Sequence, residues 1–120
     1  MQLYAPISGR QDAMAVHAYA KAVAEELERA MPKLVVSRMT KAIRPGKVLF
    51  DWSQNHPAKT TISPYSLRGR DLPTAAAPRS WEELEAGGLT QLTSDEVAAR
   101  LAADGDLAAP LLTKGPRLPA

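Results

Sequence analysis

A helical pattern of apolar residues dominates the first third of the chain. From about Asp12 to Met31, apolar side chains recur at spacings of three and four among residues that favour helices. These positions are Ala13, Val16, Ala20, Val23, Ala24, Leu27 and Met31. Pro32 follows and cannot continue a helix, because it has no amide hydrogen. The pattern therefore predicts one long helix that stops at Pro32.

Short apolar runs predict four strands. Residues 2–7 are mostly apolar and contain a proline, which limits the run, and residues 33–37 are partly β-branched. Residues 47–52 follow a Pro-Gly turn and hold three consecutive apolar side chains, which is typical of a buried strand with Asp51 at its carboxyl end. Residues 60–63 are the fourth candidate. The expected strands centre on Leu3, Val35, Val48 and Thr61.

The second half of the chain predicts short helices after a spacer. Residues 72–78 are rich in Ala and Pro and show no period. Ser80 and Glu83 fit a capping box, and residues 93–96 repeat that pattern, so short helices are expected near Trp81 and Val97. The whole pattern predicts an α/β (α+β) fold, with one long helix against a small mixed sheet and short C-terminal helices.

Composition limits the classes of protein to consider. With 120 residues, 45% apolar and 23% charged, the chain fits one globular domain. It contains no Cys, which excludes disulfides, zinc knuckles and thiol nucleophiles. No apolar run approaches the roughly 18 residues of a membrane span, and the N-terminus lacks an apolar signal core. We therefore expect a soluble, cytoplasmic protein without membrane contact.

The charge is concentrated in the middle of the chain. The net charge is only +2, but residues 33–70 hold eight basic side chains against the single carboxylate of Asp51. The eight are Lys33, Arg38, Lys41, Arg44, Lys47, Lys59, Arg68 and Arg70. Such a basic strip is typical of a phosphate-bearing partner, although a solvated basic face is the alternative. Asp51 would then be either an ion-pair partner or a metal ligand near bound phosphate.

Other catalytic patterns are missing or weak. His17 lies within the predicted helix with no acidic residue at helical spacing, which favours packing or exposure over catalysis. His56 lies in a polar loop close to Asp51. The sequence shows no Ser, His and Asp arrangement in a hydrolase context and no glycosidase pair of carboxylates. These enzyme classes therefore have no support.

Two segments resemble a known family. Residues 46–55 (GKVLFDWSQN) and 59–70 (KTTISPYSLRGR) resemble the third motif and following strand of the polymerase domain of bacterial ATP-dependent DNA ligase D. That domain is a member of the archaeo-eukaryotic primase superfamily and is used in non-homologous end joining. Residues 3–6, 39–44 and 80–84 are similar to flanking parts of the same domain.

The resemblance implies two-metal nucleotidyl transfer with Mg²⁺ or Mn²⁺. Asp51 matches the third metal-binding aspartate, which makes it the candidate catalytic and metal residue. Gln54 and Arg68 match positions that contact the incoming nucleotide, and Arg70 lies one strand period beyond Arg68, which predicts the same face. The candidate DNA- or phosphate-binding residues are Lys41, Arg44, Lys47 and Lys59.

The chain also departs from the family pattern. The other two metal aspartates of the family form an Asp-x-Asp segment, which would fall before Met1. Asp104 and Asp106 have this spacing but follow the last predicted helix, so we expect them to cap a turn. Gln2 stands where the family usually has His. The expected organisation is a partial polymerase domain over residues 1–109 and an irregular, Pro-rich tail over 110–120.

Two functional classes follow from these observations. The first is part of a DNA repair polymerase that binds DNA ends and NTP or dNTP but is inactive alone. The second is a non-catalytic module whose basic strip binds a ligase or Ku-like protein. A truncated, split or decayed gene would each give such a chain, and we expect either a homo-oligomer or a complementing upstream half.

Overall fold

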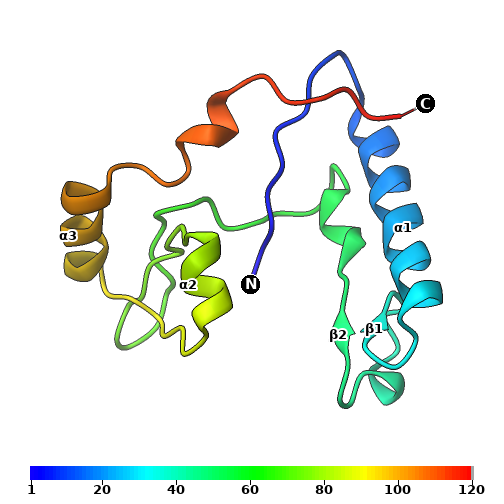
Figure 1. Ribbon diagram of the computed structural model, residues 1–120, viewed down its shortest axis with the longest axis horizontal. Coiled ribbons are helices and arrows are strands. Elements are labelled where there is room, and N and C mark those ends of the chain that lie inside the picture. Colours follow the sequence, from blue (N-terminus) through cyan, green and yellow to red (C-terminus); the bar gives the residue numbers. More distant parts are fainter. Residues whose placement is uncertain (120) are drawn as a thin grey trace. The chain divides into compact units, whose positions relative to one another are not determined.

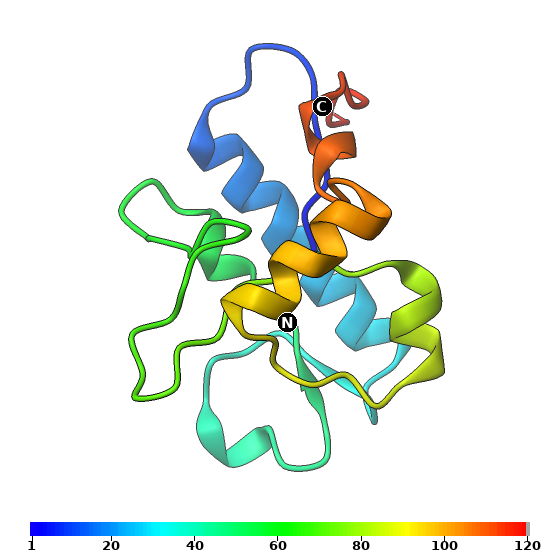
Figure 2. The same cartoon turned by 90° about the vertical axis from the view of Figure 1, so that its left-hand side faces the viewer.

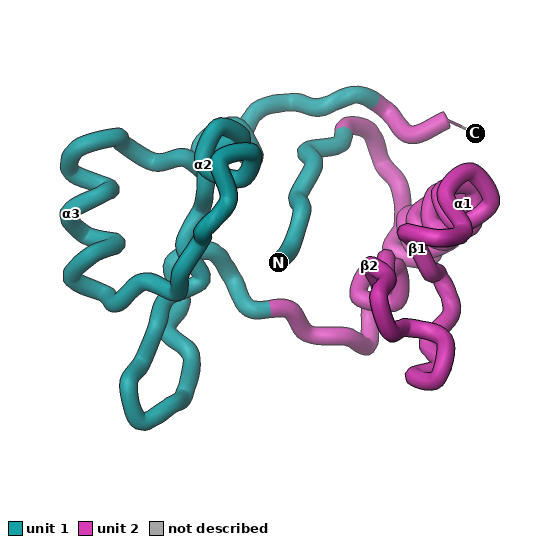
Figure 3. Tube along the Cα trace, turned by 60° about the horizontal axis from the view of Figure 1, so that its bottom comes forward, with its two compact units in different colours: residues 1–7, 62–116 teal, residues 8–61, 117–120 magenta. Residues whose placement is uncertain are grey.

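A computed structural model describes residues 1–119 and contains two compact units (Figures 1 and 3). Unit 1 comprises residues 1–7 and 62–116, and unit 2 comprises residues 8–61 together with 117–119. Each unit contains segments that are distant in sequence. The candidate residues Asp51 and Gln54 belong to unit 2, whereas Arg68 and Arg70 belong to unit 1.

The long helix of unit 2 forms as predicted. Helix α1 spans Ala13–Ala30, and the side chain of its N-cap, Asp12, accepts a hydrogen bond from the amide of Ala15 at 2.7 Å. This bond satisfies one of the amides that a helix leaves free at its first turn. The helix ends at Ala30. Met31 is its C-cap, and Pro32 follows directly. Its inner face buries Ala24 completely.

Two short parallel strands pack next to this helix. Strands β1 (Val35–Val36) and β2 (Val48–Leu49) pair in parallel, with Val35 opposite Val48 and Val36 opposite Leu49. Strand β1 contacts α1, and both of its residues are buried. The prediction of a buried strand at residues 47–52 is wrong in one respect, because Val48 is 59% exposed. Within residues 1–119, strand β2 has no neighbouring strand on its outer edge.

Short 3₁₀ turns follow each strand. Turn η1 spans Lys41–Ile43, between the strands, and turn η2 spans Trp52–Asn55, just after β2. Between η1 and β2 the amide of Lys47 donates to the carbonyl of Arg44 at 2.9 Å, which confirms the predicted turn at residues 44–47. Turn η2 packs against α1 and carries the candidate site.

Two predicted strands do not form. Residues 2–7 and 60–63 have no ladder of backbone hydrogen bonds, and the hydroxyl of Tyr4 instead donates to the carbonyl of Ile62 at 3.1 Å. Each segment borders or contains a proline, and an extended segment becomes a strand only where a second backbone pairs with it. The α/β class is confirmed, but the sheet within residues 1–119 is smaller than predicted and parallel.

Unit 1 contains the two predicted C-terminal helices. Helix α2 spans Trp81–Ala86 and helix α3 spans Ser94–Asp104, which Figure 2 shows along its length. Isolated antiparallel bridges join Leu67 to Ala75 and Ala75 to Leu92. Ala75 and Val97 are the buried apolar residues of this unit within the described chain.

The C-terminal tail is mostly irregular. It begins with a 3₁₀ turn, η3 (Ala109–Leu112), and residues 113–119 form no helix or strand. Gly115 passes so close to Pro6 that a β-carbon at Gly115 would lie 1.7 Å from the Pro6 carbonyl oxygen, which explains why glycine is needed there. The end of the predicted tail, Ala120, lies outside the described residues. None of the helices within residues 1–119 is long and apolar enough to span a membrane.

Candidate functional site

Asp51 is the N-cap of turn η2, at the carboxyl end of strand β2. Its Oδ1 atom accepts hydrogen bonds from the amide of Ser53 at 3.1 Å and from the Ser53 hydroxyl at 2.6 Å. Its Oδ2 atom accepts a longer bond, 3.4 Å, from the side-chain amide of Gln54. Asp caps such turns well because its short side chain reaches the amide two residues ahead. Side chains two and three residues further along the chain thus hold the Asp51 carboxylate in place.

These contacts favour the charged form of Asp51. The Ser53 hydroxyl is the main cause of its lowered pKa, and burial opposes the shift. The Gln54 side chain, the Ser53 amide and the positive charge of Lys59 lower the pKa further. Asp51 is therefore a carboxylate at neutral pH, exposed and oriented by its neighbours.

An aromatic cluster holds turn η2 against helix α1. The indole nitrogen of Trp52 donates to the carbonyl of Ser37 at 2.8 Å, and the Trp52 ring meets the His17 ring edge to face at 5.1 Å. His17 in turn meets His56 at 5.3 Å, and the Lys21 ammonium lies 5.2 Å from the centre of the Trp52 ring. This cluster fixes the position of the turn that carries Asp51. Of the two alternatives predicted for His17, packing or exposure, the structure shows packing.

Most of the basic strip of unit 2 is exposed. Lys41, Lys47 and Lys59 are exposed, and Arg44 is half-buried. The Arg44 guanidinium donates to the carbonyl of Met39, which fixes this side chain next to turn η1. These three exposed ammonium groups and the Arg44 guanidinium therefore share a unit with Asp51.

One cation of the strip is already neutralised within the fold. The Arg38 guanidinium lies 3.1 Å from the carboxylate of Glu28, and that carboxylate also accepts bonds from the hydroxyl and the amide of Ser37. The Ser37 hydroxyl is the main cause of the lowered pKa of Glu28. The pair joins α1 to the end of β1. The count of eight cations thus includes at least one structural residue.

Arg68 and Arg70 belong to a turn in unit 1. The amide of Arg68 donates to the carbonyl of Thr74 at 2.8 Å, and the amide of Arg70 donates back to the carbonyl of Arg68 at 2.9 Å. The backbone therefore bends at residues 68–70. The strand periodicity from which a shared face of Arg68 and Arg70 was predicted is absent, because residues 69–72 bend and belong to no strand.

The described side chains do not make a complete metal site. Within residues 1–119, no three His, Asp or Glu side chains cluster in a way that could hold a metal ion. Both Asp51 oxygens already accept hydrogen bonds, and Mg²⁺ requires six oxygen ligands. Asp104 and Asp106 do not supply the missing carboxylates, because Asp106 caps the turn before η3 by accepting from the amide of Ala108 at 2.9 Å. The expected turn cap is confirmed for Asp106, whereas Asp104 is the last residue of α3.

Comparison with known proteins identifies the family of the chain. The family model described as LigD, primase-polymerase domain, matches residues 1–108. The multifunctional non-homologous end joining protein LigD of Mycolicibacterium smegmatis is 53% identical over 116 residues, which cover 97% of this chain and 15% of that protein. The bifunctional LigD of Bacillus subtilis is 33% identical over 107 residues. The chain belongs to the LigD primase-polymerase domain family.

A solved structure confirms the fold of this LigD-type chain. The polymerase domain from Mycobacterium tuberculosis ligase D, in complex with DNA, superposes with a TM-score of 0.85 and 53% identity. The match covers 92% of this chain and 39% of that one. The chain thus spans about two fifths of the length of that polymerase domain and about 15% of the M. smegmatis LigD. The family resemblance found in the sequence is confirmed.

Residues of the aromatic cluster were not predicted as part of the site. His17 belongs to α1 and Trp52 to η2, and His56 is the C-cap of η2. His17 and Trp52 are 35 positions apart, so no local period could have linked them. The role of Ser53 was accessible to sequence reasoning, since Asp followed two residues later by Ser is a common cap pattern.

Proposed function

We propose that this chain is the part of a LigD-type end-joining polymerase that binds DNA and the incoming nucleotide. The observation that carries this proposal is the 53% identity to a polymerase domain solved in complex with DNA. The exposed lysines of unit 2 support it, because Lys59 lies close enough to Asp51 to lower its pKa, and cations near an ionised carboxylate are typical of phosphate-binding sites. Non-homologous end joining would be the pathway, as in the LigD relatives.

Each candidate residue has a role suited to its chemistry. Lys41, Arg44, Lys47 and Lys59 bind the DNA backbone or phosphate groups, and Gln54, Arg68 and Arg70 contact NTP or dNTP. Arginine pairs with phosphate through two parallel N–H bonds, whereas lysine acts as a mobile point charge. Asp51 is the metal-binding and catalytic carboxylate, for Mg²⁺ or Mn²⁺, once further carboxylates complete the site.

DNA binding is tested by its dependence on salt. A labelled single-stranded or end-containing oligonucleotide should bind with micromolar or weaker affinity, and log affinity should fall linearly with log salt concentration. Lys41→Ala with Lys47→Ala should reduce that slope by about 1.5, since each phosphate contact contributes about 0.7–0.9. Arg29→Ala is the matched control, because Arg29 is an α1 residue paired with Glu26 at 2.6 Å. Absence of binding at low salt would contradict the proposal.

The chain by itself should add no nucleotides. One carboxylate is too few to hold the metal ions that align a primer hydroxyl and a triphosphate. Primer-extension assays with Mg²⁺ or Mn²⁺ should therefore show no product. Extension that is lost in Asp51→Ala would prove that a complete site exists. Extension that requires both Asp51 and an added polypeptide with an Asp-x-Asp segment would identify a split domain.

A second function is favoured by the exposed apolar side chains. Leu34 and Val48 are more than half exposed, and they lie at and beside the two-stranded sheet of unit 2. Such residues suit a protein interface, which would make the chain a non-catalytic module for a ligase or Ku-like partner. Binding to such a protein that changes little with salt, together with weak DNA binding, would favour this function over the first.

A further inference from the structure

Tyr65 has an unusual backbone conformation. Its φ angle is 70°, and it is the one residue other than glycine with a positive φ within residues 1–119. Pro64 and Tyr65 form the centre of a tight turn, closed by a 3.2 Å bond from the amide of Ser66 to the carbonyl of Ser63. Glycine is usual at the second central position of such a turn, because a side chain disfavours this backbone. Other contacts must therefore hold Tyr65 in place.

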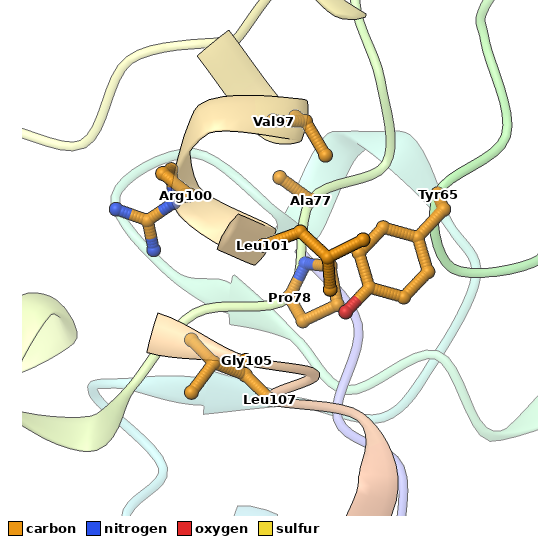
Figure 4. A pocket seen from close by; sticks show the side chains of 8 residues that line it. All are labelled: Tyr65, Ala77, Pro78, Val97, Arg100, Leu101, Gly105 and Leu107. Carbon is orange, nitrogen blue, oxygen red and sulfur yellow. The ribbon is translucent and has the colours of Figure 1, made fainter. Parts of the chain in front are cut away.

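Those contacts come from residues of unit 1 that are distant from Tyr65 in the sequence. The Tyr65 hydroxyl donates to the carboxylate of Asp106, which is itself fixed by the amide of Ala108. The ring lies beside Pro78 and Leu101, and with Leu107 these side chains line one small cavity (Figure 4). The cavity between these side chains has a volume of about 10 Å³, enough for one water molecule and far too small for a nucleotide. The ring is thus an anchor, not part of a binding pocket.

The same turn leads directly to Arg68. The amide of Tyr65 donates to the carbonyl of Ala76 at 2.8 Å, and the amide of Ala76 donates to the carbonyl of Ser66 at 2.9 Å. The next bond in this ladder joins the amide of Arg68 to Thr74. Arg68 therefore follows three residues after an anchored turn. Its Nε atom is buried and has no hydrogen-bond partner within the described chain.

We propose that Tyr65 and Asp106 form a positioning pair that sets the backbone direction of the Arg68 turn for binding a nucleoside triphosphate. This inference rests on the proposed function, because it takes Arg68 as a nucleotide contact. Burial and the neighbouring Asp106 both raise the pKa of Tyr65, so the phenol keeps its proton and remains a donor. The pair gives Asp106 a structural role. The Asp104-Gly105-Asp106 segment belongs to no group of three possible metal ligands within the described residues.

Calorimetric titration with ATP and Mg²⁺ tests the pair. Tyr65→Phe and Asp106→Ala should each weaken ATP binding about three- to ten-fold, as expected for one lost hydrogen bond. The double variant should bind no more weakly than either single one, because both remove the same bond. Asp106→Asn keeps an oxygen acceptor and should restore affinity. Asp104→Ala, a matched loss of one carboxylate two residues away, should bind ATP like the original chain.

Other results would overturn the proposal. Equal losses in Asp106→Asn and Asp106→Ala would show that the hydrogen bond is not what matters. If Arg68→Ala weakens ATP binding while Tyr65→Phe and Asp106→Ala do not, the pair has no positioning role and the proposed function stands. If the original chain does not bind ATP, or Arg68→Ala binds it unchanged, the nucleotide role of Arg68 and the pair both fail. Melting curves of every variant report whether folding is retained.

Discussion

Asp51 illustrates how a short sequence fixes a reactive group. Its carboxylate is held by Ser53 and Gln54, both within three residues, so its orientation depends little on the rest of the chain. The turn itself is fixed by distant groups, above all by the bond from Trp52 to the Ser37 carbonyl. The local contacts set the charge of the carboxylate, and the long-range ones set its position.

Removal of the Ser53 hydroxyl should raise the pKa of Asp51. This hydroxyl is the largest cause of the lowered pKa, and a hydrogen bond to the charged form favours ionisation. In Ser53→Ala, the NMR titration midpoint of the Asp51 carboxyl carbon should move up toward its ordinary value of 3.8. Ser63→Ala is a control, since the Ser63 hydroxyl donates to the carbonyl of Pro64. An unchanged midpoint in Ser53→Ala would contradict this assignment.

Among the elements of unit 1, Glu83 joins two helices. It completes the capping box at the start of α2, where its carboxylate accepts from the amide of Ser80 at 2.8 Å. The Arg100 guanidinium of α3 reaches the same carboxylate at 2.6 and 2.9 Å, and Arg79 lies 3.7 Å away. The bond from Arg100 is the main cause of a pKa lowered to about 2.

The stability of unit 1 should therefore depend on Glu83 and on acid. Because its pKa falls from 4.5 to about 2 on folding, its contribution is complete above pH 4.5 and disappears as the pH falls toward 2. Glu83→Gln should cost about 1–2 kcal/mol at pH 7, after allowance for solvent screening at this partly exposed site. Urea unfolding should show this difference shrinking as the pH falls from 4.5 toward 2. Glu85→Gln, on the same helix, should show no such trend.

The elements that the sequence predicts correctly are those with local causes. Helix α1 follows from its apolar period, and the start of α2 follows from Ser80 and Glu83 alone. The strands expected at residues 2–7 and 60–63 do not form, because a strand requires a second backbone segment to pair with, and the local sequence does not specify that segment. Val48 is exposed for the same reason, since β2 pairs with β1 alone within the described residues.

The contacts of the candidate site also fall into local ones, which the sequence predicts, and long-range ones, which it does not. The proximity of Asp51 and Gln54 was predictable because the two residues share one motif, and the structure joins them by a direct hydrogen bond. The contacts among His17, Trp52 and His56 join residues 35 to 39 positions apart, and no spacing rule predicts them. The turn at Arg70 was missed because strand periodicity was extended across Gly69, a residue that permits bends.

At the scale of the whole molecule, much apolar surface remains uncovered. The chain exposes 8992 Å². Two separate compact globules of half the 12.9 kDa mass would together expose about 7,600 Å². The excess contains large apolar side chains, such as Leu3, Leu72, Trp81 and Leu112. Only five apolar residues are buried in the described chain, so hydrophobic stabilisation is small.

The isolated chain should therefore self-associate. Burial of exposed apolar surface is favourable, and the open edge of strand β2 can pair with another backbone. Sedimentation velocity should show oligomers whose proportion grows with protein concentration. Val48→Lys places a charge on this edge and should shift the distribution toward monomer. Leu112→Lys, an equal change at an exposed position in turn η3, should shift it less. A monomer at all concentrations that melts cooperatively would contradict this prediction, because it would show that the small core suffices.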